Sequence, residues 1–241
     1  MRKLLLTLGL VASLLAVAFP AQSATALFPN LRALPASDLH LATDAGITYL
    51  QFSATNANDG VGPLELIAGE IGGGSRDVSQ RTYNDDGTFT DRLAGTFEWH
   101  ADHNHFHFED FALYTLQPVN APGAAQRTSS KTTFCVMDTD RYNTKLPGAP
   151  KRPVYNRCDR DIQGMSVGWA DTYGYYLAGQ AIAVTQSGDY RLTIEVDPKN
   201  QLVELSDLDN QSEVLVRIDL QAGTVTRLDG NANPGRGRGR P

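Results

Sequence analysis

The sequence predicts a mainly β protein, built as an antiparallel β-sandwich-like single domain with long loops. Three observations lead to this fold class. Apolar and polar residues alternate over many short runs, clusters of glycine, proline, asparagine and aspartate separate these runs, and helical periodicity is almost absent. Short strands at regular spacing with turn signals between them are typical of antiparallel two-layer folds.

The predicted domain spans residues 27–225 and follows a predicted signal peptide over residues 1–26. Arg2 and Lys3 supply the basic start of this signal, an apolar run covers residues 4–19, and small residues before the domain are typical of a cleavage site. The apolar run is too short for a comfortable transmembrane helix. We therefore expect a secreted or extracytoplasmic protein without a membrane anchor after signal removal.

The predicted strands follow one another with short turns or long loops between them. Residues 27–42 form an extended lead-in, residues 69–74 a flexible glycine loop, and residues 226–241 a disordered Gly/Arg-rich tail. We expect hairpin turns at residues 84–87 and 186–189, and long loops at residues 118–130 and 142–153. The predicted strands cover residues 46–53, 64–67, 81–83, 88–90, 97–108, 111–116, 131–136, 182–185, 190–196 and 214–220.

The net charge bears on the partners of the protein. It is −6 for the whole chain, and it moves to about −8 when Arg2 and Lys3 leave with the signal. An acidic surface does not favour nucleic acid, because phosphates require a basic footprint. It attracts cationic substrates such as amines or lysine side chains, although ordinary solubility also accounts for it.

Four of the five histidines lie within residues 97–108, and three of them repeat with a period of two. In an extended chain His103, His105 and His107 emerge on one face, with phenylalanines on the other. Three imidazoles on one face predict a metal site with open coordination positions. A straight strand separates the Cα atoms of His103 and His107 by ~13 Å, so the strand must curve or loop around the ion.

Several ions suit this histidine cluster. Affinity favours copper, zinc would bring a hydrolytic role through its bound water, and Asp102 or Glu109 could complete an iron site with two histidines. His100 falls outside the period of two, so we give it a supporting, substrate-side or purely structural role. The two cysteines, Cys135 and Cys158, predict one disulfide in an oxidising compartment.

Three motifs in order carry a resemblance to a known family. The run Trp-His-Ala-Asp-His-Asn-His-Phe-His at residues 99–107 resembles the copper-binding segment of the lysyl oxidase family, with His103, His105 and His107 matching the ligands. Residues 131–135, Lys-Thr-Thr-Phe-Cys, are similar to the family's Lys-x-x-Phe-Cys element. Gln-Gly at residues 163–164 followed by Asp-Thr-Tyr at residues 171–173 resembles a third element.

This resemblance implies a copper-dependent amine oxidase whose organic cofactor, lysine tyrosylquinone, forms from Lys131 and Tyr173. Such an enzyme converts a primary amine, including the lysine of a protein substrate, and molecular oxygen into an aldehyde, hydrogen peroxide and ammonia. Asp171 and His100 are the candidate bases. Acidic residues that usually follow the tyrosine in the family are missing here. A non-catalytic extracytoplasmic copper-binding protein and a zinc hydrolase therefore stay as alternatives.

Overall fold

The computed structural model describes residues 23–101, 104–121 and 125–230. Every regular element in these ranges is a β-strand, and all strand pairs are antiparallel. The predicted fold class, a mainly β single domain with antiparallel sheets, is confirmed. Within the same ranges no helix is long and apolar enough to cross a membrane.

The strands form three sheets. The first sheet has the order β12-β5-β6-β7-β8, with β1 added to β6; the second has the order β10-β9-β15-β16-β17; and in the third β4 pairs with β13, β14, β2 and β3, and β11 pairs with β13. The first sheet is made of β1 (Ala26–Leu27), β5 (Leu64–Gly72), β6 (Ser75–Asn84), β7 (Phe89–His100), β8 (His105–Phe108) and β12 (Ile162–Met165). The second is made of β9 (Ala112–Pro118), β10 (Arg127–Thr128), β15 (Gly188–Val196), β16 (Gln211–Asp219) and β17 (Thr224–Arg227). The third is made of β2 (Leu31–Ala33), β3 (Ser37–Asp44), β4 (Ile47–Asn58), β11 (Asp140–Arg141), β13 (Trp169–Tyr173) and β14 (Ala181–Val184).

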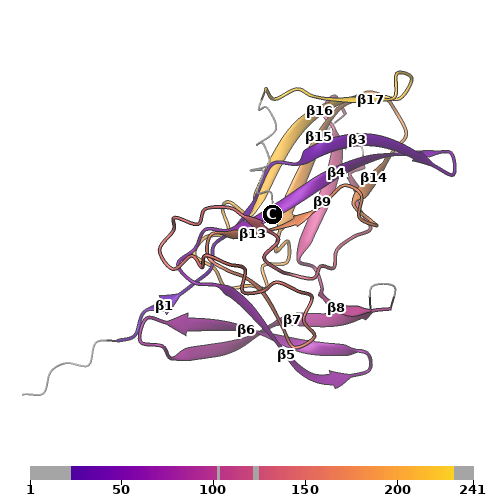
Figure 1. The fold of residues 1–241 in the computed structure, drawn as a ribbon. Helices are drawn as coiled ribbons and strands as arrows, with labels where there is room; N and C mark the ends of the chain where they lie inside the picture. Colours follow the sequence, from indigo (N-terminus) through magenta and orange to yellow (C-terminus); the bar gives the residue numbers. More distant parts are fainter. Residues whose placement is uncertain (1–22, 102–103, 122–124, 231–241) are drawn as a thin grey trace, which may run out of the picture.

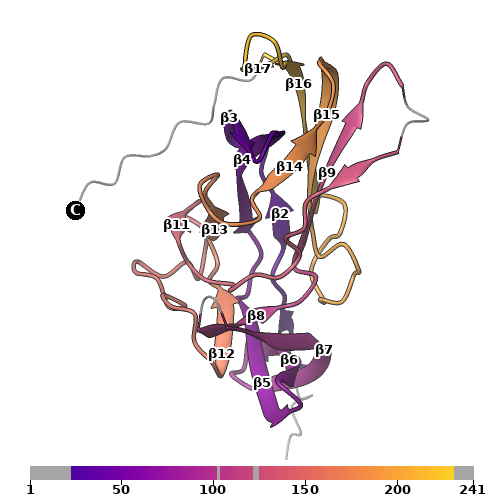
Figure 2. The ribbon, with the colours of Figure 1, turned by 90° about the vertical axis from the view of Figure 1, so that its right-hand side faces the viewer.

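The second and third sheets face each other, and the first sheet crosses beneath them (Figure 1). Figure 2 shows β4 and β2 opposite β15 and β9, with β5, β6, β7 and β8 at the lower end. One continuous core joins the three sheets. Phe52 of β4 meets Tyr114 of β9 edge to face, with ring centroids 5.2 Å apart, and Tyr114 in turn meets Phe134 at 5.9 Å. Aromatic packing of this kind stabilises the interior that lies directly behind the candidate site.

Several local predictions differ from the structure. The glycine loop over residues 69–74 is the tip of a hairpin, because β5 continues through Gly72 and only Gly73 and Gly74 turn with positive φ. The predicted hairpin at residues 186–189 is wrong, since β14 pairs with β4 while β15 pairs with β9 and β16. The hairpin at residues 84–87 is confirmed, and Gly87 has the expected positive φ of 82°.

The segment of residues 131–136, predicted as a strand, makes only one isolated bridge. Phe134 pairs with Phe108 at the end of β8, with backbone hydrogen bonds of 2.7 and 3.0 Å between them. The β-branched residues that suggested a strand instead hold an extended connection across the interior. This connection brings Lys131 next to residues from the third sheet.

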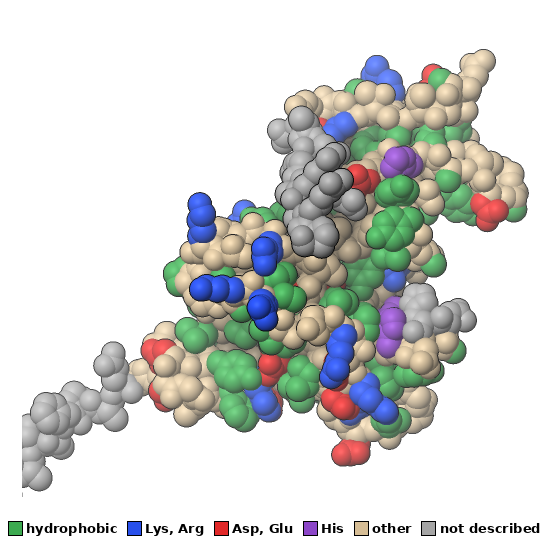
Figure 3. All heavy atoms as spheres, in the orientation of Figure 1, with side chains coloured by type: hydrophobic (Ala, Val, Ile, Leu, Met, Phe, Trp, Pro, Cys, Tyr) green, Lys and Arg blue, Asp and Glu red, His purple; other side chains and the backbone are tan. Residues whose placement is uncertain are grey.

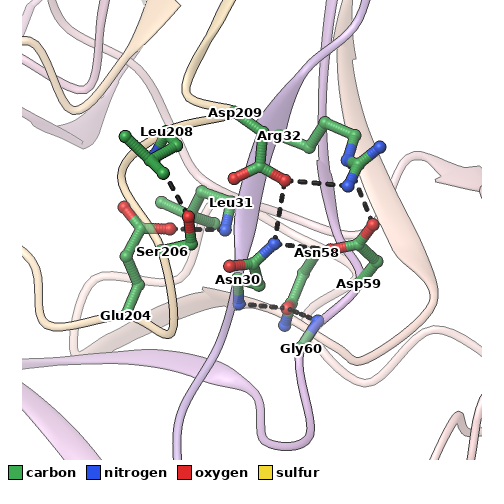
Figure 4. A network of polar contacts seen from close by, with 10 residues as sticks. All are labelled: Asn30, Leu31, Arg32, Asn58, Asp59, Gly60, Glu204, Ser206, Leu208 and Asp209. Carbon is green, nitrogen blue, oxygen red and sulfur yellow. Dashed lines mark hydrogen bonds and ion pairs between the residues drawn. The ribbon is translucent and has the colours of Figure 1, made fainter.

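A polar network ties β2 to residues 204–209 (Figure 4). Asn30 donates from Nδ2 to Asp59 at 2.8 Å and to Asp209 at 3.1 Å, and Arg32 binds both carboxylates. The carboxylate of Glu204 accepts from the backbone N–H of Leu31 at 2.6 Å. Burial raises the pKa of Glu204 to about 7 from its ordinary value of 4.5, although hydrogen bonds from Leu31 and Asn210 oppose the shift.

Glu204 is expected to make stability fall as pH rises from about 4.5 to 7. In this window the folded protein keeps a proton that the unfolded chain releases, so unfolding becomes more favourable with increasing pH. Glu204→Gln should reduce the loss in the free energy of unfolding between these pH values by up to about 3 kcal/mol, at ~1.4 kcal/mol per pKa unit. Urea denaturation of both proteins at several pH values measures the difference. Parallel curves would contradict this assignment.

Candidate active site

The antiparallel pairing of β7 with β8 organises the histidine cluster. His100 ends β7 and His105 begins β8, and the two are directly opposite each other in the strand register. The backbone N–H of Asn104 donates to the carbonyl of His100 at 2.8 Å, and Asn104 has a positive φ of 57°. Residues 97–108 are therefore a hairpin and not the single extended strand that we expected. Predicted ligand His103 and its neighbour Asp102 lie outside the described residues.

His105 and His107 lie side by side, and their Nε2 atoms are 2.8 Å apart. Two nitrogens bound to one ion at about 2.0–2.1 Å and at right angles are separated by about 2.9 Å. The observed spacing therefore suits neighbouring ligands of one metal ion. On the other side of β8, Phe106 packs against Trp99 and Phe108 against Phe97, with ring centroids 5.1 and 6.0 Å apart.

His100 joins the cluster through the turn, although its spacing in the sequence does not predict this. Its ring stacks on that of His107 with centroids 4.2 Å apart. The hydroxyl of Thr133 lies 3.0 Å from Nε2 of His100 and 3.3 Å from Nδ1 of His107. Thr133 thus orients two rings at once. Residues that hydrogen-bond to metal-binding histidines commonly fix the orientation of the rings in this way. Sequence reasoning missed Thr133, although it lies in the same motif as Lys131 and Cys135.

Lys131 and Tyr173 meet in the structure despite their distance in the sequence. The Nζ atom of Lys131 lies 5.0 Å from the centroid of the Tyr173 ring and 4.9 Å from that of Phe134. The Tyr173 hydroxyl donates to the carbonyl of Cys135 at 2.8 Å, and Phe134 packs edge-on against the Tyr173 ring at 4.7 Å. Gly179 permits this arrangement, because its φ is 78° and an added Cβ would lie 3.1 Å from Cβ of Lys131.

Burial shifts the proton affinities of this pair. It lowers the pKa of the Lys131 amine, and the nearby Asp171 carboxylate opposes the change. It raises the pKa of the Tyr173 hydroxyl well above its ordinary value, and the Asp171 charge adds to that rise. A lysine with a lowered pKa exposes its nucleophilic neutral amine at a lower pH than an ordinary lysine does.

Asp171 is a deeply buried carboxyl group in this region, with only 1% of its surface exposed. It lies on β13 opposite Asn56 of β4, and its Oδ2 accepts from the backbone N–H of Met137 at 3.4 Å. Its Oδ1 has no hydrogen-bond partner among the described residues. Burial raises the pKa of Asp171 well above its ordinary value, and the charges of Asp138 and Asp140 raise it further. The hydrogen bond from Met137 and the charge of Lys131 act in the opposite direction. A carboxyl group of this kind is suited to proton transfer.

One extended segment, residues 131–135, joins the histidine cluster to the lysine and tyrosine. Lys131 reaches toward Tyr173, Thr133 contacts two histidines, and the Cys135 carbonyl binds the Tyr173 hydroxyl. The predicted disulfide is confirmed and anchors the end of this segment to Cys158. The same stretch of chain therefore contacts both parts of the candidate site.

Gln163 supports the same arrangement from within the core. Its side chain is completely buried, accepts from the backbone N–H of Val136 at 3.0 Å, and donates to the carbonyl of Phe106 at 2.8 Å. It therefore links β8 to the segment that follows Cys135. The sequence signalled Gln163 only as part of a motif and gave no role for it.

The residues present suit both groups that the resemblance implies. Imidazole nitrogens at the spacing of neighbouring ligands fit copper or zinc. A lysine amine close to a tyrosine ring fits a covalent link between the two side chains. Figure 3 shows histidine side chains at two levels of one face, over β3 and over β8, with hydrophobic side chains between them.

Comparisons with known proteins agree with these motifs. The family model described as lysyl oxidase matches residues 80–227. Human lysyl oxidase homolog 1 is 36% identical over 118 residues, which cover 48% of this chain and 19% of that protein, and the bovine protein of the same name gives the same identity over 18% of its length. Human protein-lysine 6-oxidase is 31% identical over 132 residues, which cover 52% of this chain and 28% of that protein. The chain thus spans less than a third of each of these relatives, but the family model matches more than half of the chain. The protein therefore belongs to the lysyl oxidase family.

Proposed function

We propose that the protein is a secreted, copper-dependent amine oxidase that oxidises primary amines. The observation that carries this proposal is the position of the Lys131 amine, 5.0 Å from the Tyr173 ring centroid, on a segment whose Thr133 contacts the histidine cluster. Lys131 is partly buried against the rings of Phe134 and Tyr173, so its amine is close to the ring that it would join. The proposed substrates are primary amines, including lysine side chains of proteins, and the second substrate is molecular oxygen.

His103, His105 and His107 are the proposed copper ligands, and His100 with Thr133 orients the His107 ring from the side. Copper and oxygen together would supply the oxidation that joins Lys131 to Tyr173, and the resulting lysine tyrosylquinone would supply the carbonyl that reacts with primary amines. The hydrogen bond from the Tyr173 hydroxyl to the Cys135 carbonyl and the edge-on packing of Phe134 hold the ring close to the Lys131 amine. The lowered pKa of Lys131 makes its neutral, nucleophilic form available.

Asp171 is our candidate for the base that removes a proton from the α-carbon of the bound amine. It is buried beside Lys131 and Tyr173, and its proton affinity is raised by the loss of water around it. His100 is the second candidate, but its Nε2 atom is engaged with Thr133 at 3.0 Å. Phe134 and Tyr114 line the buried side of the region and exclude water from it.

Loading the purified protein with copper in air tests this function. We expect a visible absorption band that phenylhydrazine removes, and a cross-linked peptide pair containing Lys131 and Tyr173 by mass spectrometry. Hydrogen peroxide should appear with at least one member of a panel of primary amines. If the two peptides stay unlinked after full copper loading, the oxidase function is wrong.

A non-catalytic copper-binding protein is the alternative that one observation favours. Residues 174–181, which follow Tyr173, contain no acidic side chain, so Asp171 is the acidic group nearest to Tyr173 in this part of the sequence. Copper binding without peroxide release from any amine would support this alternative. A zinc hydrolase is the third hypothesis, and the metal content of the natively purified protein distinguishes it from the other two.

His107→Ala is expected to weaken copper binding by at least about 100-fold, because it removes a nitrogen donor and the stacking partner of His100. His40→Ala is the matched control. His40 lies on β3, where its ring packs at a tilt against Tyr175 with ring centroids 4.2 Å apart. Copper affinity measured against a competing chelator should be unchanged by His40→Ala. Equal losses in both variants would contradict the assignment of the cluster.

A further inference from the structure

The disulfide lies directly against the histidine cluster, and this position has a consequence outside the oxidase reaction. A ring nitrogen of His105 and the sulfur atoms of Cys135 and Cys158 all lie within 4.8 Å of one another. The thioether sulfur of Met137 is 4.0 Å from the sulfur of Cys158. Three sulfur atoms and one imidazole thus gather at one point of the fold.

We propose that reduction of the Cys135–Cys158 disulfide creates a Cu(I) site formed by Cys135, Cys158 and His105, with Met137 as a fourth donor. Thiolate and thioether sulfurs are the soft ligands that select Cu(I) over harder cations. The disulfide form cannot offer this site, because neither sulfur is then a thiolate. The site overlaps the proposed oxidase site, because His105 is a ligand in both.

The distances are compatible with a shared ion after small movements. Ligand atoms bound at about 2.0–2.3 Å lie roughly 3.5–4 Å apart at tetrahedral or trigonal angles. Breaking the disulfide lets the two sulfurs separate to that range, and the His105 nitrogen, within 4.8 Å of both sulfurs, would move inward by at most about 1 Å. Cys158 lies in the chain between β11 and β12, outside any strand, whereas Cys135 is buried and held by the segment that pairs with β8.

A phosphine is the reductant for the Cys135–Cys158 disulfide. A phosphine takes up oxygen from water as it cleaves the disulfide, giving the phosphine oxide and two thiols. Each thiol then loses a proton to solvent as it binds Cu(I), and the metal keeps its oxidation state. Oxygen would reverse the reduction: the two thiols form the disulfide again, and oxygen takes up their two electrons and two protons to give hydrogen peroxide, so that both thiolate ligands are lost.

Anaerobic titration with Cu(I) against a chromophoric Cu(I) chelator tests the proposal on the full chain. The phosphine-reduced protein should bind one Cu(I) at least about 100-fold more tightly than the disulfide form. His107→Ala should keep this tight binding, because it removes a proposed oxidase-site ligand but no ligand of the sulfur site, whereas Cys158→Ser and His105→Ala should lose it. Equal affinity in the reduced and disulfide forms would overturn the proposal.

A second measurement avoids variants that fold poorly. Alkylation of the reduced wild-type protein, followed by mass spectrometry, should show both cysteines protected when one equivalent of Cu(I) is present and both modified when it is absent. Unchanged modification of either cysteine would reject the site. The result does not depend on the oxidase function, because no amine, oxygen or cross-link enters the experiment.

Discussion

Tyr173→Phe is expected to abolish amine oxidation, with peroxide release falling to the rate of free copper, while copper binding is retained. A phenylalanine ring has no oxygen from which a quinone could be formed. The substitution should cost stability only about 1 kcal/mol, because a single hydrogen bond to the Cys135 carbonyl is lost and the ring still packs against Phe134. Peroxide assays on copper-loaded protein and chemical denaturation measure the two effects separately.

Lys131→Met should give the same loss of activity for a different reason, since it removes the nitrogen of the proposed link but keeps the volume of the side chain. Tyr176→Phe and Lys199→Met are matched controls. Tyr176 is an exposed tyrosine three residues after Tyr173, and Lys199 forms a surface ion pair with Asp110 at 2.6 Å. Both controls should keep full activity. An active Lys131→Met protein would show that the cofactor does not need this lysine.

Local patterns in the sequence predict the strands better than they predict their partners. The alternation in residues 214–220 and the glycine in the turn at residues 84–87 determine local geometry, and the structure agrees with both. The pairing of β14 with β4 depends on residues about 130 positions apart. Because a short apolar run fits beside any sheet edge, the pattern in residues 182–185 cannot select β4 over the nearby β15.

In the candidate site, too, the sequence predicted local geometry better than contacts between distant residues. A period of two predicted that His105 and His107 lie together, and their Nε2 atoms are adjacent. The strand pairing that brings His100 onto His107 was missed, because Asn104, just before β8, has a positive φ without glycine or proline as a signal. The contact between Lys131 and Tyr173 follows from no periodicity at all, and only the family resemblance suggested it. The charge environment of Asp171 depends on burial, which a lone aspartate in a sequence does not reveal.

Asp171→Asn is expected to lower the turnover of amines by about 100- to 10,000-fold, the usual range for loss of a positioned acid or base. Asparagine has nearly the same shape and keeps an oxygen that can accept from the Met137 N–H. Copper binding and the link between Lys131 and Tyr173 should therefore remain, so the loss would lie in kcat. The His100→Gln protein provides the comparison, because His100 is the other candidate base. A much larger loss in His100→Gln than in Asp171→Asn would transfer the role to His100.

The pH dependence of the reaction gives the second test of Asp171. A base must be deprotonated to act, and burial raises the pKa of this carboxyl group well above 3.8, so kcat should rise with pH through an elevated pKa. The positive charge of Lys131 partly opposes that shift. Once the Lys131 nitrogen is joined to the ring and uncharged, this opposition ends, and the pKa of Asp171 should be higher in the cross-linked protein than in the precursor. Asp171→Asn should remove the rising limb of the kcat profile, whereas Asp140→Asn, which removes an exposed charge that helps to raise the pKa of Asp171, should only shift it. A rising limb that survives in Asp171→Asn would exclude Asp171 as the base.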